Sequence, residues 1–215
     1  SIPLFSFKNT IVYNGAKNHK YILNYLRKNP SNLNFKTENF LQVENWLENK
    51  NINPKKLITL TLRTKKDANQ RNSRLKDWIK FYEFLKSKNF NPIFIPDLEG
   101  PVEFLEDKNY NFCLPASYNF VFRLHLMKTS KLNIFVNTGP SAPALFFDNN
   151  YIFIKPISKN DTYIDDWVSE KAFINQGFVI NKDIEYFEKS YFRKIVWDED
   201  TFENLKKSFE EFENF

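Results

Sequence analysis

The stretch from Leu57 to Leu85 constrains the fold more than any other part of this chain. It opens with the letters LITLTLR, in which leucine and isoleucine flank β-branched threonine, and this pattern predicts a buried strand that ends on Arg63. A polar loop follows, and Asn72 or Ser73 is then placed to cap a helix. That helix is predicted because apolar residues recur at the spacing of one helical face, at Leu75, Trp78, Ile79, Tyr82 and Leu85.

Arginines gather at the junction between this strand and this helix. The chain has 31 basic residues but only six arginines, and Arg63, Arg71 and Arg74 fall within twelve positions. Arginine offers a bidentate geometry that lysine lacks, and ligands of open α/β sheets bind at the carboxyl ends of strands. We therefore predict an anion site, above all for phosphate, with Asn72 beside the arginines. The alternative is a solvated loop that carries surface charges.

The rest of the chain continues the pattern of alternating strands and helices. Strands are predicted within 91–97, 111–114, 132–136 and 151–155, and an amphipathic helix closes the chain after Thr201. This order predicts an α/β fold, a Rossmann-like open parallel sheet with helices on both faces. Residues 57–215 would form this domain. Residues 1–56 are predicted to be a short N-terminal appendage, or the remnant of another domain, with a helix around Trp46 that packs on the sheet.

Carboxylates follow the second predicted strand. Asp97 and Glu99 come directly after its apolar run, where a carboxylate can accept hydrogen bonds from ribose hydroxyls or from a substrate. Capping of a following helix is an equally open alternative. Farther along, Arg123 lies within a predicted helix and faces either the same cleft or the solvent, while His125 is predicted to be packed and His19 to be a surface residue.

A turn after the next strand completes the candidate site. The strand at 134–136 leads into Asn137, Thr138 and Gly139, with Pro140 suited to the first turn of a helix. Gly139 is one of only four glycines and permits a close approach of the backbone to a ligand. Amides near Gly139 and Ser141 can therefore hold a diphosphate without a glycine-rich loop. The chain contains no GxGxxG and no P-loop sequence.

Composition excludes several other classes of protein. The single cysteine, Cys113, rules out an internal disulfide and fits a reducing compartment, and no apolar run is long enough to cross a membrane. No signal peptide is recognisable, so a cytoplasmic location is expected. The net charge is +5, but the lysines are scattered among acidic residues. Affinity for anions is expected, whereas the basic stripe of a nucleic-acid binder is missing.

Four stretches together resemble a known family. They are LTLRTKKDANQRNSRLKDWIKF, FIPDLE, RLHLMKTSKLNIFVNTGPSAPALF and KIVWDEDTFENLKKSF, and in this order they resemble the donor-binding domain of bacterial GT-B glycosyltransferases of surface-polysaccharide clusters. The arginine at the strand end is similar to the basic motif of fucosyltransferase-like enzymes, and NTGPSAPA is similar to the heptosyltransferase-type turn. The resemblance covers about residues 57–212.

The resemblance implies a glycosyltransferase that uses a nucleotide sugar as donor, without a further cofactor, and a glycan or lipid-linked acceptor, with peripheral contact to the membrane. Arg63 and Arg71 would bind the donor diphosphate, and Asp97 or Glu99 the ribose or the sugar. The phosphate and ribose side would be lined by Asn137, Thr138, Gly139 and Ser141. No catalytic base is identified, and a full first domain is not present in the sequence, so a non-catalytic nucleotide- or sugar-binding module is the alternative.

Metal-independent transfer is expected as well. The one acidic group close to an Asp-x-Asp sequence, Asp198 to Asp200, is predicted to form the first turn of the C-terminal helix, where carboxylates favour the helix dipole.

Overall fold

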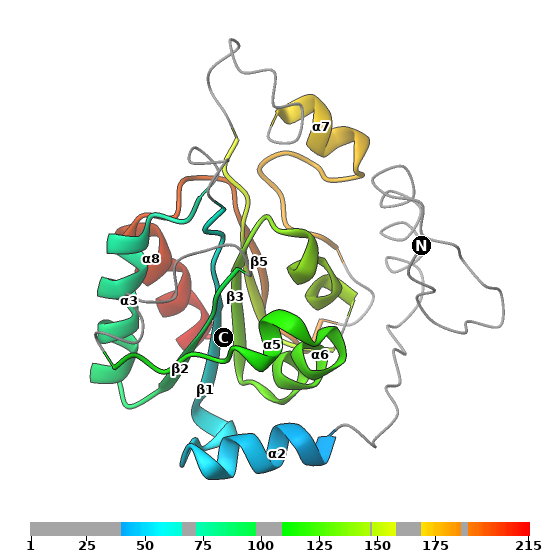
Figure 1. The fold of residues 1–215 in the computed structure, drawn as a ribbon. Coiled ribbons are helices and arrows are strands. Elements are labelled where there is room, and N and C mark those ends of the chain that lie inside the picture. Colours follow the sequence, from blue (N-terminus) through cyan, green and yellow to red (C-terminus); the bar gives the residue numbers. More distant parts are fainter. Residues whose placement is uncertain (1–39, 66–71, 98–108, 147, 158–168, 186–188) are drawn as a thin grey trace, which may run out of the picture.

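The fold is built on a five-stranded parallel sheet (Figure 1). The computed structural model describes residues 40–65, 72–97, 109–146, 148–157, 169–185 and 189–215. The strands follow the spatial order β2-β1-β3-β4-β5. Their bounds are β1 (Leu57–Thr61), β2 (Asn91–Ile95), β3 (Leu132–Val136), β4 (Tyr151–Ile154) and β5 (Arg193–Val196). The predicted α/β class and parallel sheet are confirmed.

The order of the strands reverses at β1, which lies between β2 and β3. The chain moves outward from β1 to β2 on one side, and then crosses over to β3 on the other side. Phe112 extends the first side through a single parallel bridge to Phe94, at the place of the strand predicted at 111–114. When this bridge is counted as a strand, the order becomes 3-2-1-4-5-6, that of doubly wound dinucleotide-binding sheets.

Helices cover both faces of the sheet (Figure 1). On one face lie α3 (Leu75–Ser87) and α8 (Phe202–Glu213), whose buried side chains meet Ile58, Leu60, Ile134 and Ile152. On the other face lie α2 (Phe40–Asn49), α5 (Pro115–Tyr118), α6 (Phe120–Thr129) and the 3₁₀ helix η5 (Gly139–Phe146). A 3₁₀ turn, η3 (Pro54–Lys56), precedes β1, and α7 (Glu170–Asn175) precedes β5.

Successive side chains of a strand point to opposite faces of the sheet, so each strand supplies residues to both cores. In β3, Leu132, Ile134 and Val136 pack against α3 and α8, whereas Phe135 packs with Leu145 of η5 on the opposite face. Since every residue of β1, β3 and β4 is buried, these strands read as nearly continuous apolar runs, as expected of a sheet covered on both sides. The predicted helix around Trp46 is confirmed as α2, which packs beside Leu57 and Ile93.

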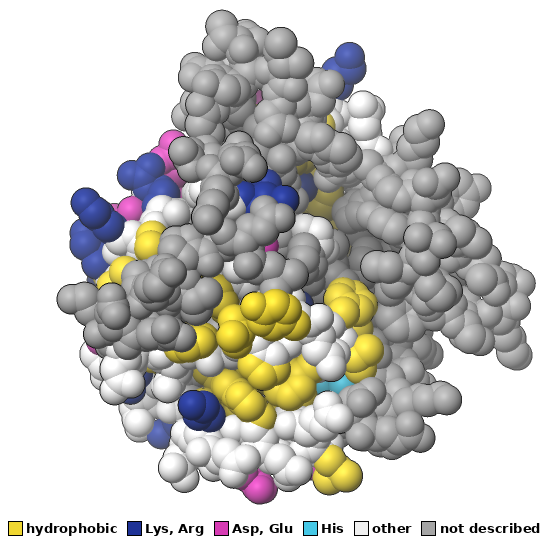
Figure 2. All heavy atoms as spheres, in the orientation of Figure 1, with side chains coloured by type: hydrophobic (Ala, Val, Ile, Leu, Met, Phe, Trp, Pro, Cys, Tyr) yellow, Lys and Arg dark blue, Asp and Glu magenta, His cyan; other side chains and the backbone are white. Residues whose placement is uncertain are grey.

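Two buried polar residues of the sheet, Thr59 of β1 and Asn133 of β3, form hydrogen bonds on the face that α6 covers. Thr59 Oγ1 donates to Asn133 Oδ1 at 2.5 Å, and the Asn133 amide donates to the carbonyl of Met127 at 2.8 Å. This network ties the end of α6 to the sheet. An apolar surface remains on the outside of the same layer, where Tyr118 and Val121 are exposed (Figure 2).

Several helix caps differ from those predicted. The N-cap residue of α3 is Arg74, whose own side chain makes no capping hydrogen bond, so neither Asn72 nor Ser73 caps this helix. The cap of α6 is Asn119, whose side chain accepts from the amide of Phe122 at 3.0 Å. The cap of α8 is Thr201, with Phe202 as the first helical residue, and the acidic group 198–200 therefore precedes the helix instead of forming its first turn. Strand β5 was not predicted.

Candidate functional site

Polar side chains follow four neighbouring strands at one edge of the sheet. Arg63 comes two residues after β1, Asp97 two residues after β2, Asn137 directly after β3 and Lys155 directly after β4. Adjacent strands lie about 5 Å apart, so these four positions line one continuous edge. Arg63 and Asn137 follow β1 and β3, the two strands at which the strand order reverses. Ligands of open α/β sheets bind at such a point.

The backbone of Arg63 is held by Ser73. The amide of Arg63 donates to Ser73 Oγ at 2.9 Å, and the amide of Ser73 donates to the carbonyl of Arg63 at 2.8 Å. Asn72 makes a second pair of bonds, because it accepts from the amide of Lys65 at 3.0 Å and donates to the carbonyl of Lys65 at 2.7 Å. The residues predicted as caps thus close the loop between β1 and α3, and they fix the point from which the half-buried Arg63 side chain extends.

Threonine hydroxyls lie next to Arg63 in the chain. Thr61, which is buried, and Thr64, which is half-buried, both have enclosed hydroxyl oxygens without a hydrogen-bond partner in the described part of the chain. Sequence reasoning did not single out these two residues. The sequence feature that could have identified them is the alternation of threonine with leucine up to the strand end, which we interpreted only as β propensity.

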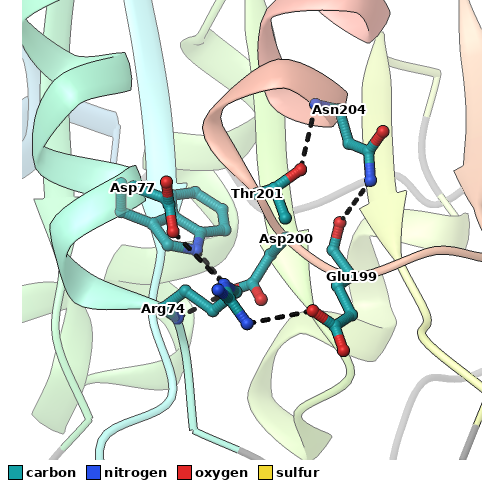
Figure 3. Close-up of polar contacts among 7 residues, drawn as sticks. Arg74, Asp77, Glu199, Asp200, Thr201 and Asn204 are labelled. Atoms are coloured by element: carbon teal, nitrogen blue, oxygen red, sulfur yellow. Dashed lines mark hydrogen bonds and ion pairs between the residues drawn. The ribbon is translucent and has the colours of Figure 1, made fainter.

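Arg74 lies between two carboxylates, those of Asp77 and Glu199 (Figure 3). Its Nε donates to Asp77 Oδ2 at 3.2 Å, and its Nη1 donates to Glu199 Oε2 at 2.9 Å. These carboxylates raise the pKa of Arg74, and the hydrogen bond that Arg74 donates to Asp77 is the largest cause. An anionic ligand would have to compete with both carboxylates for this guanidinium. The predicted role of Arg74 in donor binding stays a prediction.

Asp200 occupies the start of α3. It accepts from the Arg74 amide at 2.9 Å and from Trp78 Nε1 at 2.6 Å, and it is buried (Figure 3). A carboxylate from the loop before α8 therefore already interacts with the positive end of α3. The sequence suggested an exogenous anion there, but the fold supplies an internal one at the Arg74 amide.

The turn after β3 is compact. Ser141 is buried, and its hydroxyl lies 2.8 Å from that of Thr138, while its amide donates to the Thr138 carbonyl at 3.2 Å. The predicted helix start is confirmed as the 3₁₀ helix η5, which begins at Gly139. Gly139 is exposed and has no positive φ, and a Cβ built on it meets no described heavy atom within 4 Å. The space in front of Gly139 is therefore open among the described residues, and its backbone conformation does not itself require a glycine.

Lys155 was missed by the sequence reasoning. It ends the apolar strand YIFIK just as Arg63 ends LITLTLR, and this parallel was the available signal. Its side chain is 1% exposed, and Nζ lies 3.3 Å from Asn137 Oδ1 and 3.4 Å from Gln176 Oε1. The same Nζ lies 4.0 Å from the ring centre of Phe173 and 4.2 Å from that of Phe178, close enough for cation–π attraction. The lysine thus links the ends of β3 and β4 to the residues around α7.

Other candidate residues divide into buried and undescribed ones. His125 is fully buried in α6, which confirms that it is a packed histidine. Arg123 is buried as well, so it does not face the solvent. Arg71, Glu99 and His19 lie outside the described residues. Among the described residues, no group of three or more His, Cys, Asp or Glu side chains is arranged to hold a metal ion.

Searches against protein-family models, curated proteins and solved structures found no match to this chain. The resemblance to glycosyltransferases therefore rests on the quoted residues alone. None of the described helices combines the length and the apolar character that a membrane span requires.

Proposed function

We propose that this protein is a glycosyltransferase that binds the diphosphate of a nucleotide sugar at the carboxyl edge of its sheet. One observation carries the proposal: Arg63 follows β1 and the turn Asn137–Thr138–Gly139 follows β3, at the point where the strand order reverses. Guanidinium groups and the start of a helix are both suited to phosphate. The GT-B assignment and a role in surface-polysaccharide synthesis rest on the sequence resemblance.

The chemistry at this edge would be electrostatic. Transfer of a sugar from a nucleoside diphosphate builds negative charge on the departing phosphate oxygens. Fixed cations and donors stabilise such charge because they are already oriented before it develops. Arg63 would provide the paired N–H groups, Lys155 a second cation one strand beyond the turn, and Thr138 a hydroxyl. Open space at Gly139 would let a phosphate approach the backbone.

Calorimetry with a panel of UDP, GDP, CMP and ADP sugars tests the proposal, with turnover measured for each donor that binds. Arg63→Ala is expected to weaken binding of the preferred donor by about 1.5–3 kcal/mol, as for a lost charge-assisted hydrogen bond. Arg63→Lys is expected to recover only part of this loss, because the ammonium cannot bind in a bidentate manner. Unchanged affinity of Arg63→Ala would remove Arg63 from the site.

Arg193→Lys is the matched control. The Arg193 side chain is 4% exposed and pairs with Asp148, but it begins β5 and so lies at the opposite, amino end of the sheet. This variant is expected to bind the donor normally. Donor binding without turnover, in the presence of a range of glycan and lipid-linked acceptors, would favour the non-catalytic binding module.

A further inference from the structure

Lys155 is a buried lysine whose ammonium group is enclosed by oxygens and aromatic rings. It is 1% exposed, and its Nζ lies 3.3 Å from Asn137 Oδ1 and 3.4 Å from Gln176 Oε1. The ring centres of Phe173 and Phe178 lie 4.0 and 4.2 Å from the same atom. Such an enclosed ammonium acts on a ligand at the sheet edge mainly through its neighbours, and Asn137 is the neighbour that follows a strand of the candidate site.

Asn137 lies between Lys155 and Arg63 in the row of strand ends. β3 pairs with β4 on one side and with β1 on the other, and all three strands are parallel. The register of β3 and β4, continued by one residue, brings Asn137 beside Lys155. The register of β3 and β1, continued by two residues, brings Asn137 beside Arg63. The asparagine is therefore a link between the buried lysine and the arginine of the proposed diphosphate site.

The contact with Lys155 fixes which end of the Asn137 amide faces the lysine. An ammonium has three N–H donors and no acceptor, so only the carbonyl oxygen of Asn137 can bind it. The amide nitrogen, Nδ2, is therefore turned away from Lys155, and it donates to no residue in the described part of the chain. Asn137 is half-buried and its Nδ2 is not enclosed by the protein, so a ligand can reach the two N–H groups.

A lysine is well suited to hold this amide. Contact with a cation draws electron density toward the amide oxygen and makes the N–H groups stronger donors. An apolar residue would fill the space between the rings of Phe173 and Phe178 without the desolvation that a buried ammonium requires. Packing alone therefore gives no reason for a lysine at this position, whereas orientation of Asn137 does.

We propose that Lys155 is a positioning residue that holds Asn137 as a hydrogen-bond donor to a phosphate oxygen. Phosphate oxygens are acceptors, so they match the N–H groups of Asn137 Nδ2 as they match the guanidinium of Arg63. The Asn137 oxygen, which could otherwise accept from a ribose hydroxyl, is engaged by Lys155. This inference rests on the proposed diphosphate site, and it assigns Asn137 to the phosphate and not to the ribose.

The side-chain amide signals of Asn137 test the proposal directly. In a ¹⁵N nuclear magnetic resonance spectrum they are identified by their loss in Asn137→Asp, and the Nε–Hε signal of Arg63 is identified by its loss in Arg63→Lys. The protein is titrated with inorganic pyrophosphate, with UDP, GDP, CDP and ADP, and with the matching nucleosides. Pyrophosphate and a diphosphate are expected to shift the signals of both residues, whereas the nucleosides should leave those of Asn137 in place. In Lys155→Met, the response of the Asn137 signals to pyrophosphate should be strongly reduced.

A double-mutant cycle shows whether Lys155 acts through Asn137. Lys155→Met removes the ammonium and keeps an unbranched side chain between the rings, and it is expected to weaken pyrophosphate binding by about tenfold or more in calorimetry. In an Asn137→Ala background the same replacement should weaken binding by only about twofold, because the amide that it orients is absent and the charge alone acts at a distance. An equal effect in both backgrounds would overturn the inference. Arg193→Lys, which alters a buried cation at the opposite end of the sheet, should change neither the signals nor the affinity.

Asn137→Asp separates a donor from an acceptor. Aspartate keeps an oxygen for Lys155 but has no N–H group to donate. Because Asn137 donates to phosphate in this proposal, the variant should keep its melting temperature and bind pyrophosphate more weakly than Asn137→Ala, since a carboxylate repels the anion. Pyrophosphate affinity equal to that of the wild type would contradict the donor role, and this variant decides the matter if Lys155→Met does not fold.

The outcomes separate this inference from the proposed function. If pyrophosphate shifts the Arg63 signal while the Asn137 signals stay in place, the inference is overturned and the diphosphate site stands. If neither pyrophosphate nor any diphosphate shifts a signal of either residue, the proposed function fails and the inference fails with it. If pyrophosphate shifts both residues as expected but no nucleotide sugar is bound or turned over, the positioning role of Lys155 stands and the glycosyltransferase function fails.

Discussion

Replacement of Asp200 by alanine is expected to lower the stability of the fold, and this effect does not depend on ligand binding. Asp200 is buried and accepts two hydrogen bonds through Oδ2, from Trp78 Nε1 at 2.6 Å and from the Arg74 amide at 2.9 Å. These bonds connect the start of α3 to the loop before α8, two elements separated by more than a hundred residues. The carboxylate therefore acts as the junction between the two helices that cover one face of the sheet.

The magnitude follows from what each donor loses. Trp78 is fully buried, so its indole N–H would be left without an acceptor, at a cost of about 1–3 kcal/mol. Arg74 is exposed, and water can replace the carboxylate at its amide, so this bond contributes only about 0.5–1 kcal/mol. The sum predicts a loss of about 1.5–4 kcal/mol in the free energy of unfolding, a large part of the total stability of an ordinary domain.

Urea denaturation followed by circular dichroism provides the measurement, with Glu199→Ala as the matched control. Glu199 is the neighbouring acid, but its side chain is 67% exposed and its ion pair with Arg74 is on the surface. Its removal is expected to cost less than about 1 kcal/mol. A double-mutant cycle with Trp78→Phe then isolates the contact, because Asp200→Ala should cost less once the indole N–H is gone. Equal effects of Asp200→Ala and Glu199→Ala would refute the reasoning.

Three further outcomes are expected. Gly139→Val should leave the unfolding free energy within about 0.5 kcal/mol of the wild type, because its Cβ projects into open space, and should weaken nucleotide binding; normal binding would show that the turn does not face the ligand. Lys155→Met should weaken nucleoside diphosphate binding by about tenfold or more in calorimetry, through loss of a cation at the edge, and unchanged affinity would exclude it from the site. Burial raises the pKa of Cys113 to about 12, so the native state favours the neutral thiol. Its stabilising contribution is complete below pH 9 and should fall by about 1.4 kcal/mol per pH unit between the unfolded value and pH 12, a slope that Cys113→Ala should remove in denaturation curves at increasing pH.

Local patterns in the chain were enough to predict the class of fold. The apolar runs at 57–62, 132–136 and 151–154 are buried on both faces, and such runs separated by helical periodicity predict a covered parallel sheet. The pattern failed for β5, because only Ile195 and Val196 of its four residues are buried, and such a short run carries little periodicity. A strand of this kind is recognisable only by its partner, β4.

The candidate site was likewise predictable from the sequence only in part. Residues at strand ends were predictable, because the carboxyl ends of parallel strands must share one edge, and Arg63, Asp97 and Asn137 follow from that rule. The partners of each polar group were not predictable from spacing. Asn72 and Ser73 have the composition of helix caps, yet they bind the backbone of Lys65 and Arg63 across the loop, and the carboxylate at the start of α3 comes from Asp200.

The amino-acid sequence by itself determined the strands β1 to β4 and the helices α2, α3 and α8, and it placed Arg63, Asp97 and Asn137 at strand ends, because these features depend on neighbours within a few residues. Only the tertiary structure decided that Arg74 is paired with Glu199 and that Arg123 is buried, with its Nε donating to the carbonyl of Ala116. The physical reason is that burial and charge pairing are set by residues distant in the chain, and for Arg74 and Glu199 that separation is 125 positions.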